Sequence, residues 1–144
     1  MPRMRAIFWI AILSLYSAVG ACEPDNPDTL VAFTTDGCSS FPDGTLSHQQ
    51  LWHRCCTAHD LAYWAGGVLD ERLKADLELR ACVISVGEPA VAELMLAGVR
   101  VGGSPWLPTT FRWGYGWPYT HGYTALTPEE NTQVSEQKKR QGIN

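Results

Sequence analysis

Residues 52–67 read WHRCCTAHDLAYWAGG, and this stretch decides what the rest of the chain can build. Side chains three or four positions apart lie on one face of a helix. Four residues of the stretch would share such a face: Cys55, Cys56, His59 and Tyr63. Asp60 would point about 100° away from His59. The pattern predicts a helix that carries cysteines for cross-linking and a histidine beside a carboxylate aimed elsewhere.

The flanking residues indicate where this helix and its neighbours begin and end. Ser47 is a suitable N-cap for a helix over about residues 48–65, and Gly66-Gly67 would end it. Asp70 can cap a second helix over residues 71–86. Its expected inward-facing apolar residues are Leu73, Leu77 and Ile84. The short connection predicts that the two helices are antiparallel neighbours.

The remaining segments differ in composition. Pro89 suits the first turn of a third helix, which Gly102-Gly103 would stop. Residues 104–123 are rich in Trp and Tyr and show no regular period, so they form either a cover over the helices or an aromatic belt at a lipid boundary. The polar tail, residues 127–144, is expected to be frayed or disordered. The sequence thus predicts a small all-α domain over residues 34–126, stapled by disulfides.

The first 21 residues have the features of a secretory signal peptide. A basic start with Arg3 and Arg5 precedes an apolar run that is shorter than the roughly 20 residues needed to span a bilayer. The run ends in VGAC at Cys22, which resembles the lipobox of bacterial lipoproteins. Lipidation of Cys22 would also explain the odd number of cysteines. The alternative is ordinary cleavage after Ala21, which would leave a free thiol on a secreted or periplasmic protein.

The charge of the exported chain limits its partners. Removal of the signal peptide leaves nine basic residues against 15 acidic ones. An excess of negative charge disfavours binding to nucleic acid and electrostatic docking on anionic lipid. A lipid anchor at Cys22, followed by a spacer over residues 22–33, would make such docking unnecessary. We therefore expect a phospholipid membrane surface as a partner and leave any protein partner unknown.

The four remaining cysteines allow a geometric test. If Cys55 is bonded to Cys82, His59 lies about 6 Å along the first helix from its cysteine, and Asp76 lies about 9 Å along the second in the same direction. Asp76 could then accept a hydrogen bond from His59 and orient it. Cys56 would pair with Cys38 in the loop before the helix. The sequence does not exclude the swapped pairing.

The loop over residues 34–45 is dense in turn residues. Asp36, Asp43 and free backbone carbonyls make it a weak candidate seat for a hard cation, which prefers oxygen ligands. Most loops with two Asp-Gly pairs are simply turns.

Together these residues resemble a known family. The run from Cys55 to Tyr63 is similar to the Cys-Cys-x-x-His-Asp-x-x-Tyr helix of secreted phospholipases A2. Residues 35–38 followed by Pro42-Asp43 resemble the calcium loop of the small bacterial and fungal branch. Asp76, six residues before Cys82, matches the family's second-helix aspartate and the cysteine after it. The resemblance covers about residues 34–82.

The resemblance implies a calcium-dependent hydrolysis of phospholipid acyl esters. His59 would be the general base that takes a proton from water, with Asp76 orienting it and Tyr63 supporting Asp76. The residues implied as Ca²⁺ ligands are the side chains of Asp36 and Asp60 and the carbonyl of Gly37. Two departures stand out: Ala62 replaces a cysteine found in many animal members, and residues 39–42 replace their glycine-rich calcium loop.

Three other interpretations remain open, two of the function and one of the metal site. One is a non-catalytic, phospholipase-like lipoprotein that binds lipid or a protein partner in the cell envelope. Another is an acyl hydrolase that acts on different esters. A zinc site has enough candidate ligands, although neighbouring cysteines rarely both reach one tetrahedral ion. Those candidates are His48, His53, Cys55, Cys56 and His59.

Overall fold

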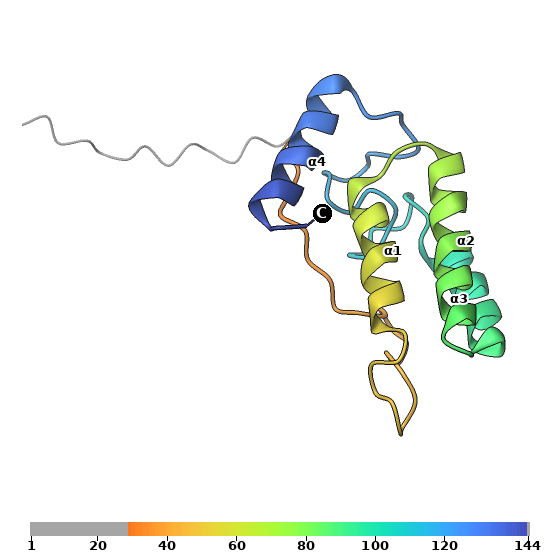
Figure 1. Cartoon of the computed structure of the whole chain (residues 1–144). Helices are drawn as coiled ribbons and strands as arrows, with labels where there is room; N and C mark the ends of the chain where they lie inside the picture. The colour runs from red at the N-terminus through yellow and green to blue at the C-terminus, as the bar shows by residue number, and fades with distance from the viewer. Residues whose placement is uncertain (1–28, 144) are drawn as a thin grey trace, which may run out of the picture.

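The computed structural model describes residues 29–143. Its four helices are α1 (His53–Ala65), α2 (Leu69–Ser85), α3 (Pro89–Gly102) and α4 (Pro128–Arg140). No strand occurs within the described residues, which two disulfides cross-link. The predicted class, a small all-α domain with disulfides, is therefore confirmed. Helices α1 and α2 run side by side in opposite directions, and α3 packs on α2 (Figure 1).

Helix α1 begins later than residue 48, where the sequence analysis placed its start. Ser47 is not its cap, because the Ser47 hydroxyl lies 3.2 Å from both the Thr45 hydroxyl and His48 Nδ1 in a local turn. Thr45 and His48 close this turn with backbone hydrogen bonds of 3.0 and 3.2 Å. At the other end, Gly66 adopts the left-handed φ of 73° and donates to the Ala62 carbonyl. The predicted glycine stop is correct.

Helix α2 turns a partly charged face toward the core. Its buried residues are Arg72, Ala75, Asp76, Leu79 and Val83. Leu77 and Ile84 are 52% and 37% exposed, so the prediction that they face inward is wrong. The spacing of apolar residues does not identify the inward face of α2, because Arg72 and Asp76 lie on that face.

The ends of α2 and α3 are set by local chemistry. The carboxylate of Glu71 accepts a 2.8 Å hydrogen bond from the N–H of Val68 and so caps α2. Asp70, the predicted cap, lies in the first turn instead. Helix α3 has the bounds that the sequence predicts, with Pro89 in its first turn and Gly103 after its last residue.

The polar tail forms α4, so the expectation of a frayed or disordered end is wrong. Thr127 and Glu130 cap the helix reciprocally: the Glu130 N–H donates to the Thr127 hydroxyl (3.1 Å), and the Thr127 N–H donates to the Glu130 carboxylate (2.8 Å). Pro128 fits the first helical position, where no N–H is needed. These signals for a helix start outweigh the polar composition of the segment.

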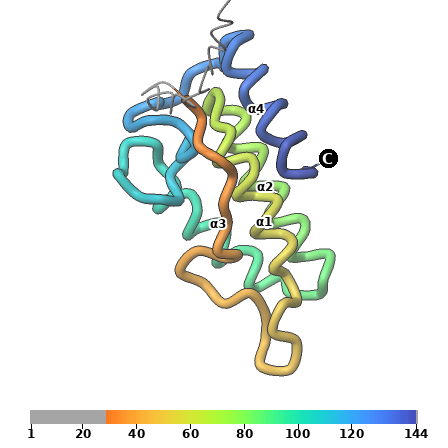
Figure 2. Tube along the Cα trace, turned by 90° about the vertical axis from the view of Figure 1, so that its left-hand side faces the viewer, coloured from red at the N-terminus to blue at the C-terminus, as the bar shows by residue number. Residues whose placement is uncertain are grey.

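Two glutamines of α4 and Gln141, the residue directly after it, hold the extended segment at the beginning of the described chain. Leu30 donates its N–H to Gln133 (3.0 Å) and accepts from Gln137 (3.2 Å). Phe33 exchanges both of its backbone hydrogen bonds with Gln141, at 3.1 and 3.0 Å. The glutamines are four residues apart and therefore share a face of α4. The extended segment runs along α1 toward the loop that precedes it (Figure 2).

The core consists of three apolar clusters. One surrounds the disulfides between α1, α2 and α3. A second joins the two ends of the described chain through Leu30, Trp64, Trp117 and Val134. The third contains Tyr63, Ala75 and Trp113.

Two tryptophans of the aromatic segment pack as a cover. The indole N–H groups of Trp113 and Trp117 donate to the carbonyls of Gly67 and Ala65 at the end of α1, at 2.8 and 2.7 Å. Both side chains are buried. The same segment leaves Trp106 more than half exposed.

The predicted signal peptide, residues 1–21, and the predicted lipidation site Cys22 lie outside the residues that the structure describes. Among the helices of residues 29–143, none is long and apolar enough to cross a membrane. Disulfides persist in oxidising compartments. The two bridges therefore suggest an extracytoplasmic environment.

Candidate active site

His59 lies on the face of α1 that meets α2, directly opposite Asp76. Its Nε2 is 3.0 Å from Asp76 Oδ1, and the Tyr63 hydroxyl donates to the same oxygen at 2.7 Å. Burial raises the pKa of Tyr63, which keeps its hydroxyl a donor. An ionised carboxylate can only accept, so Nε2 carries the imidazole hydrogen and Nδ1 keeps its lone pair. Within residues 29–143 no hydrogen bond uses Nδ1 of His59.

Two arginines that the sequence analysis did not single out complete this cluster. The buried guanidinium of Arg72 donates to the Tyr63 hydroxyl (3.0 Å) and to the carbonyls of Val99 (2.8 Å) and Arg100 (3.0 Å). Arg100 Nε lies 2.7 Å from Asp76 Oδ2 as an ion pair. That oxygen receives no conventional hydrogen bond. Three side chains, His59 and Tyr63 from α1 and Arg100 from α3, therefore contact the one carboxylate on α2.

A sequence signal existed for only one of these arginines. Arg72 precedes Asp76 by four residues and so shares its face of α2. Arg100 lies on α3, and no pattern in the sequence indicates which residues of α2 and α3 meet.

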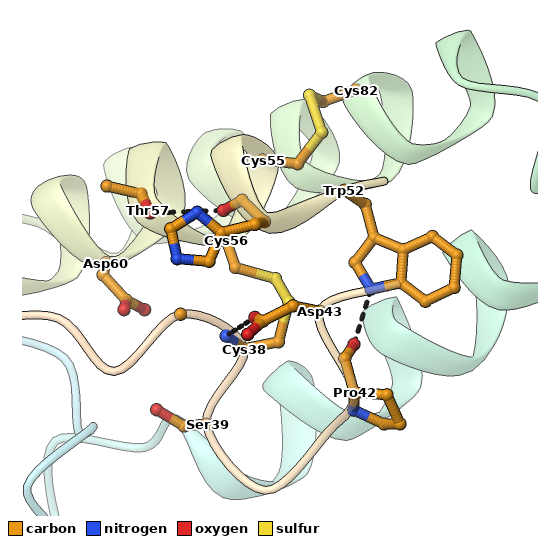
Figure 3. The surroundings of a disulfide bond; sticks show 12 residues. Cys38, Ser39, Pro42, Asp43, Trp52, Cys55, Cys56, Thr57, Asp60 and Cys82 are labelled. Carbon is orange, nitrogen blue, oxygen red and sulfur yellow. Dashed lines mark hydrogen bonds between the residues drawn. A yellow bond between two sulfur atoms is a disulfide. The ribbon is translucent and has the colours of Figure 1, made fainter. Parts of the chain in front are cut away.

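The disulfides fix the loop beside α1. The adjacent Cys55 and Cys56 send their sulfur atoms to different elements, Cys82 on α2 and Cys38 in the loop (Figure 3). This is the pairing that we tested geometrically, and the swapped one does not occur.

Within the loop, Gly37 occupies a position that requires glycine. Gly37 has a left-handed φ of 82°, and a Cβ there would lie 2.3 Å from Asp43 Oδ1. The same oxygen accepts the N–H of Cys38 at 2.8 Å. Asp36 accepts a hydrogen bond from the Ser39 hydroxyl at 2.8 Å. The loop therefore holds two carboxylates in a folded turn next to α1.

Asp60 extends from α1 toward this loop (Figure 3) and accepts the hydroxyl of Thr35 at 2.6 Å. The pKa of Asp60 is raised to about 6, first by burial and also by the negative charges of Asp36 and Asp43, against the lowering effects of Thr35 and His59. The carboxylates of Asp36 and Asp43 thus lie close enough to Asp60 to interact with it electrostatically. Such a concentration of negative charge attracts a cation.

The donor set suits a hard cation better than zinc. Within the described residues, no three His, Cys, Asp or Glu side chains group closely enough to bind a metal alone. A cation beside Asp60 and Asp36 would need backbone oxygens as well, such as the Gly37 carbonyl, and all-oxygen coordination of this kind is typical of Ca²⁺. The predicted zinc site cannot use Cys55 and Cys56 as thiolate ligands, because both are in disulfides.

A pocket of about 410 Å³ opens onto these groups. Its wall includes His59, Asp60 and Tyr63 from α1 and Gly37 from the loop. Helix α3 contributes apolar and small residues, namely Leu94, Met95, Gly98, Val99 and Gly102. The pocket therefore pairs an imidazole and a carboxylate with a surface that favours an apolar chain.

The structure brings the predicted site residues to one place. His59, Asp60, Tyr63 and Gly37 line the pocket, and Asp76 stands behind His59. Asp36 lies in the loop near Asp60. Thr35 was missed, although it lies directly beside the predicted ligand Asp36. Comparisons of the chain with protein-family models, curated proteins and solved structures gave no match.

Proposed function

We propose that this protein is a calcium-dependent hydrolase of phospholipid acyl esters, of the phospholipase A2 type. One observation carries the proposal: the buried His59–Asp76 hydrogen bond of 3.0 Å stands at the wall of an apolar pocket that Asp60 also lines. A structural histidine needs no pocket beside its ring. The similarity of residues 34–82 to the secreted enzymes supports the same conclusion.

In the proposed reaction, His59 acts as a general base. Its Nδ1 takes a proton from a water molecule in the pocket as the water oxygen attacks the ester carbonyl. The same proton passes to the departing alcohol when the carbon–oxygen bond breaks. The products are a fatty acid and a lysophospholipid. Asp76 stabilises the imidazolium that forms in between, and Tyr63 holds Asp76 in place.

Ca²⁺ held by Asp60, Asp36 and the Gly37 carbonyl would polarise the ester carbonyl and neutralise the negative charge that develops on its oxygen. The raised pKa of Asp60 is consistent with this role, because a bound cation would offset the mutual repulsion of the carboxylates. The apolar residues of α3 would hold the acyl chain.

The test is release of fatty acid from mixed phospholipid vesicles with Ca²⁺ or with a chelator. We expect Ca²⁺-dependent release by the wild-type protein and at least about a 100-fold loss in His59→Gln. His48→Gln is a matched control, since His48 is exposed and contacts only its own turn. Equal signals from wild type and His59→Gln would leave the non-catalytic lipid binder as the better account. Comparing lysophospholipids and other esters in the same assay identifies the substrate class.

For localisation, we propose that Cys22 carries the lipid anchor. Cys22→Ser should then release the protein from membranes and leave its hydrolytic rate on soluble short-chain substrate unchanged. Membrane association of that variant, measured by fractionation, would contradict the proposal.

A further inference from the structure

Arg100 forms an ion pair whose two partners differ sharply in exposure. Its Nε lies 2.7 Å from Asp76 Oδ2, and its side chain is 37% exposed, while the carboxylate of Asp76 is fully buried. Another arginine provides a comparison. Arg80 pairs with Glu93 and is 39% exposed, but Glu93 is 56% exposed. The two arginines have similar exposed fractions, but only Arg100 pairs with a carboxylate that is fully buried.

Asp76 needs that cation whenever His59 is the neutral base of the proposed reaction, because the remaining contact, the Tyr63 hydroxyl, is also neutral. Oδ1 accepts hydrogen bonds from the imidazole of His59 and the hydroxyl of Tyr63. Arg72 is nearby, but its donors go to Tyr63, Tyr123 and backbone carbonyls. Among residues 29–143, Arg100 is the one arginine or lysine within ion-pair distance of Asp76. A buried carboxylate with neutral donors alone is costly to keep ionised.

We propose that Arg100 is a positioning residue that keeps Asp76 ionised and thereby holds His59 in the tautomer with hydrogen on Nε2. Arg100 does not line the pocket, so it acts through Asp76 and does not touch the substrate. The part of the proposal that concerns catalysis rests on the proposed hydrolase function. The tautomer of His59 can be observed independently of it.

The consequence of losing Arg100 follows from counting hydrogens. In the proposed response to loss of the guanidinium, Asp76 takes up a proton from solvent on Oδ1, the oxygen 3.0 Å from His59 Nε2, and this O–H donates to Nε2 while Oδ1 still accepts from Tyr63. The imidazole hydrogen must move to Nδ1, which removes the lone pair that the proposed reaction uses. A base in this wrong tautomer cannot accept a proton from water.

The decisive experiment is nitrogen-15 NMR of the histidine rings in the full chain, with the His59 signals identified by their loss in His59→Gln. We expect the Nε2–H tautomer in the wild type, in Arg100→Lys and in Arg80→Gln. In Arg100→Gln we expect His59 to show the Nδ1–H tautomer. An unchanged Nε2–H tautomer in a folded Arg100→Gln would overturn the proposal.

Kinetics on phospholipid vesicles provide the second readout. We expect Arg100→Gln to lower kcat by roughly 100-fold with KM changed less than about twofold, and Arg100→Lys to restore most of kcat. Arg80→Gln should match the wild type. If the wild-type protein releases no fatty acid, the hydrolase function fails, while the tautomer measurement still decides the role of Arg100.

A second pair of variants covers the case in which Arg100→Gln does not fold. Asp76→Asn removes the buried charge, so Arg100 has nothing to stabilise in that background. We expect Asp76→Asn and the double variant Asp76→Asn/Arg100→Gln to fold and to share one kcat. If Arg100→Gln lowers kcat further in the Asp76→Asn background, Arg100 acts by another route and the proposal is wrong.

Discussion

At the scale of single residues, Asp76 and Asp60 show how one residue type takes two roles. Asp76 is fully buried, and its oxygens contact His59, Tyr63 and Arg100. Asp60 is on the pocket wall, has one hydroxyl partner in Thr35, and has a pKa raised to about 6, first by burial. The first carboxylate is compensated by the protein itself. The second is left with unbalanced charge, as expected of a residue that binds a cation.

The raised pKa of Asp60 predicts a pH-dependent stability. The folded state holds a proton that the unfolded chain releases between about pH 4 and pH 6, so the free energy of unfolding falls as pH rises through that window. We expect a loss of about 1–2 kcal/mol, discounted for the solvent that reaches this side chain. Urea unfolding at pH 4, 5, 6 and 7 checks it, as the difference between wild type and Asp60→Asn.

Calcium should reverse this loss. Because Ca²⁺ binds the ionised carboxylate, its stabilising effect should be largest at pH 7 and weak at pH 5. Asp60→Asn should keep the fold and lose the effect at both pH values. A calcium-dependent rise in Tm that persists in Asp60→Asn would show that the ligand assignment is wrong.

At the scale of elements, the two disulfides have different tasks. Cys55–Cys82 joins α1 to α2 across 27 residues, and Cys38–Cys56 ties the loop to α1 across 18. By loop length, each should contribute about 3 kcal/mol to stability. The first sets the register of the helices that carry His59 and Asp76. The second holds the loop that carries the proposed calcium ligands.

Replacing each pair of cysteines with alanine separates these tasks. We expect both variants to lose similar stability, about 3 kcal/mol in urea unfolding. Only Cys38→Ala/Cys56→Ala should bind Ca²⁺ more weakly, by roughly tenfold or more in calorimetry, because its loop is released. Equal Ca²⁺ affinities in the two variants would show that the loop does not contribute ligands.

Gly98 on α3 offers a test of the apolar pocket. A Cβ at this position would meet no atom within 4 Å, and Gly98 lines the pocket. Gly98→Leu should therefore fold, gain up to about 1 kcal/mol from helix propensity, and occupy the pocket. We expect hydrolysis of long-chain substrates to fall at least tenfold and that of short-chain ones to change little. Ala97→Leu, at the exposed neighbouring position, should leave both rates unchanged.

The sequence predicted the end of α1 and both ends of α3 well because their signals are local. The cysteine–histidine spacing, Gly66 and Pro89 each act within a turn or two. The sequence-based prediction failed for the inward face of α2. There the charged residues Arg72 and Asp76 are buried, while the apolar residues Leu77 and Ile84 are exposed. Arg100 could not be found, since its role depends on how α3 meets α2.

At the scale of the whole molecule, the second apolar cluster joins both ends of the described chain. Leu30 is 1% exposed and packs with Trp64, Trp117 and Val134. Composition alone suggested a spacer before the domain and a loose tail after it. Both segments supply core residues, because α4 and the extended segment bury each other's apolar side chains.

This shared cluster predicts coupled stabilities. Leu30→Ala should cost about 2–4 kcal/mol and Val134→Ala about 1–2 kcal/mol. Combined, they should cost less than the sum by about 1 kcal/mol, since the first removes part of the environment of the second. Leu30→Ala with Val83→Ala is the control, because Val83 belongs to a different cluster and its cost should add. Additivity in both pairs, from denaturant unfolding, would contradict a common cluster.

The glutamine contacts of α4 also determine when the molecule can finish folding. They join residues 103 to 108 positions apart, so the earliest described segment waits for nearly the last. A chain that leaves the ribosome amino end first contains Leu30 and Trp64 long before Val134, so their shared cluster is complete only after α4 has been made. Until then, one side of the polypeptide lacks its packing partner.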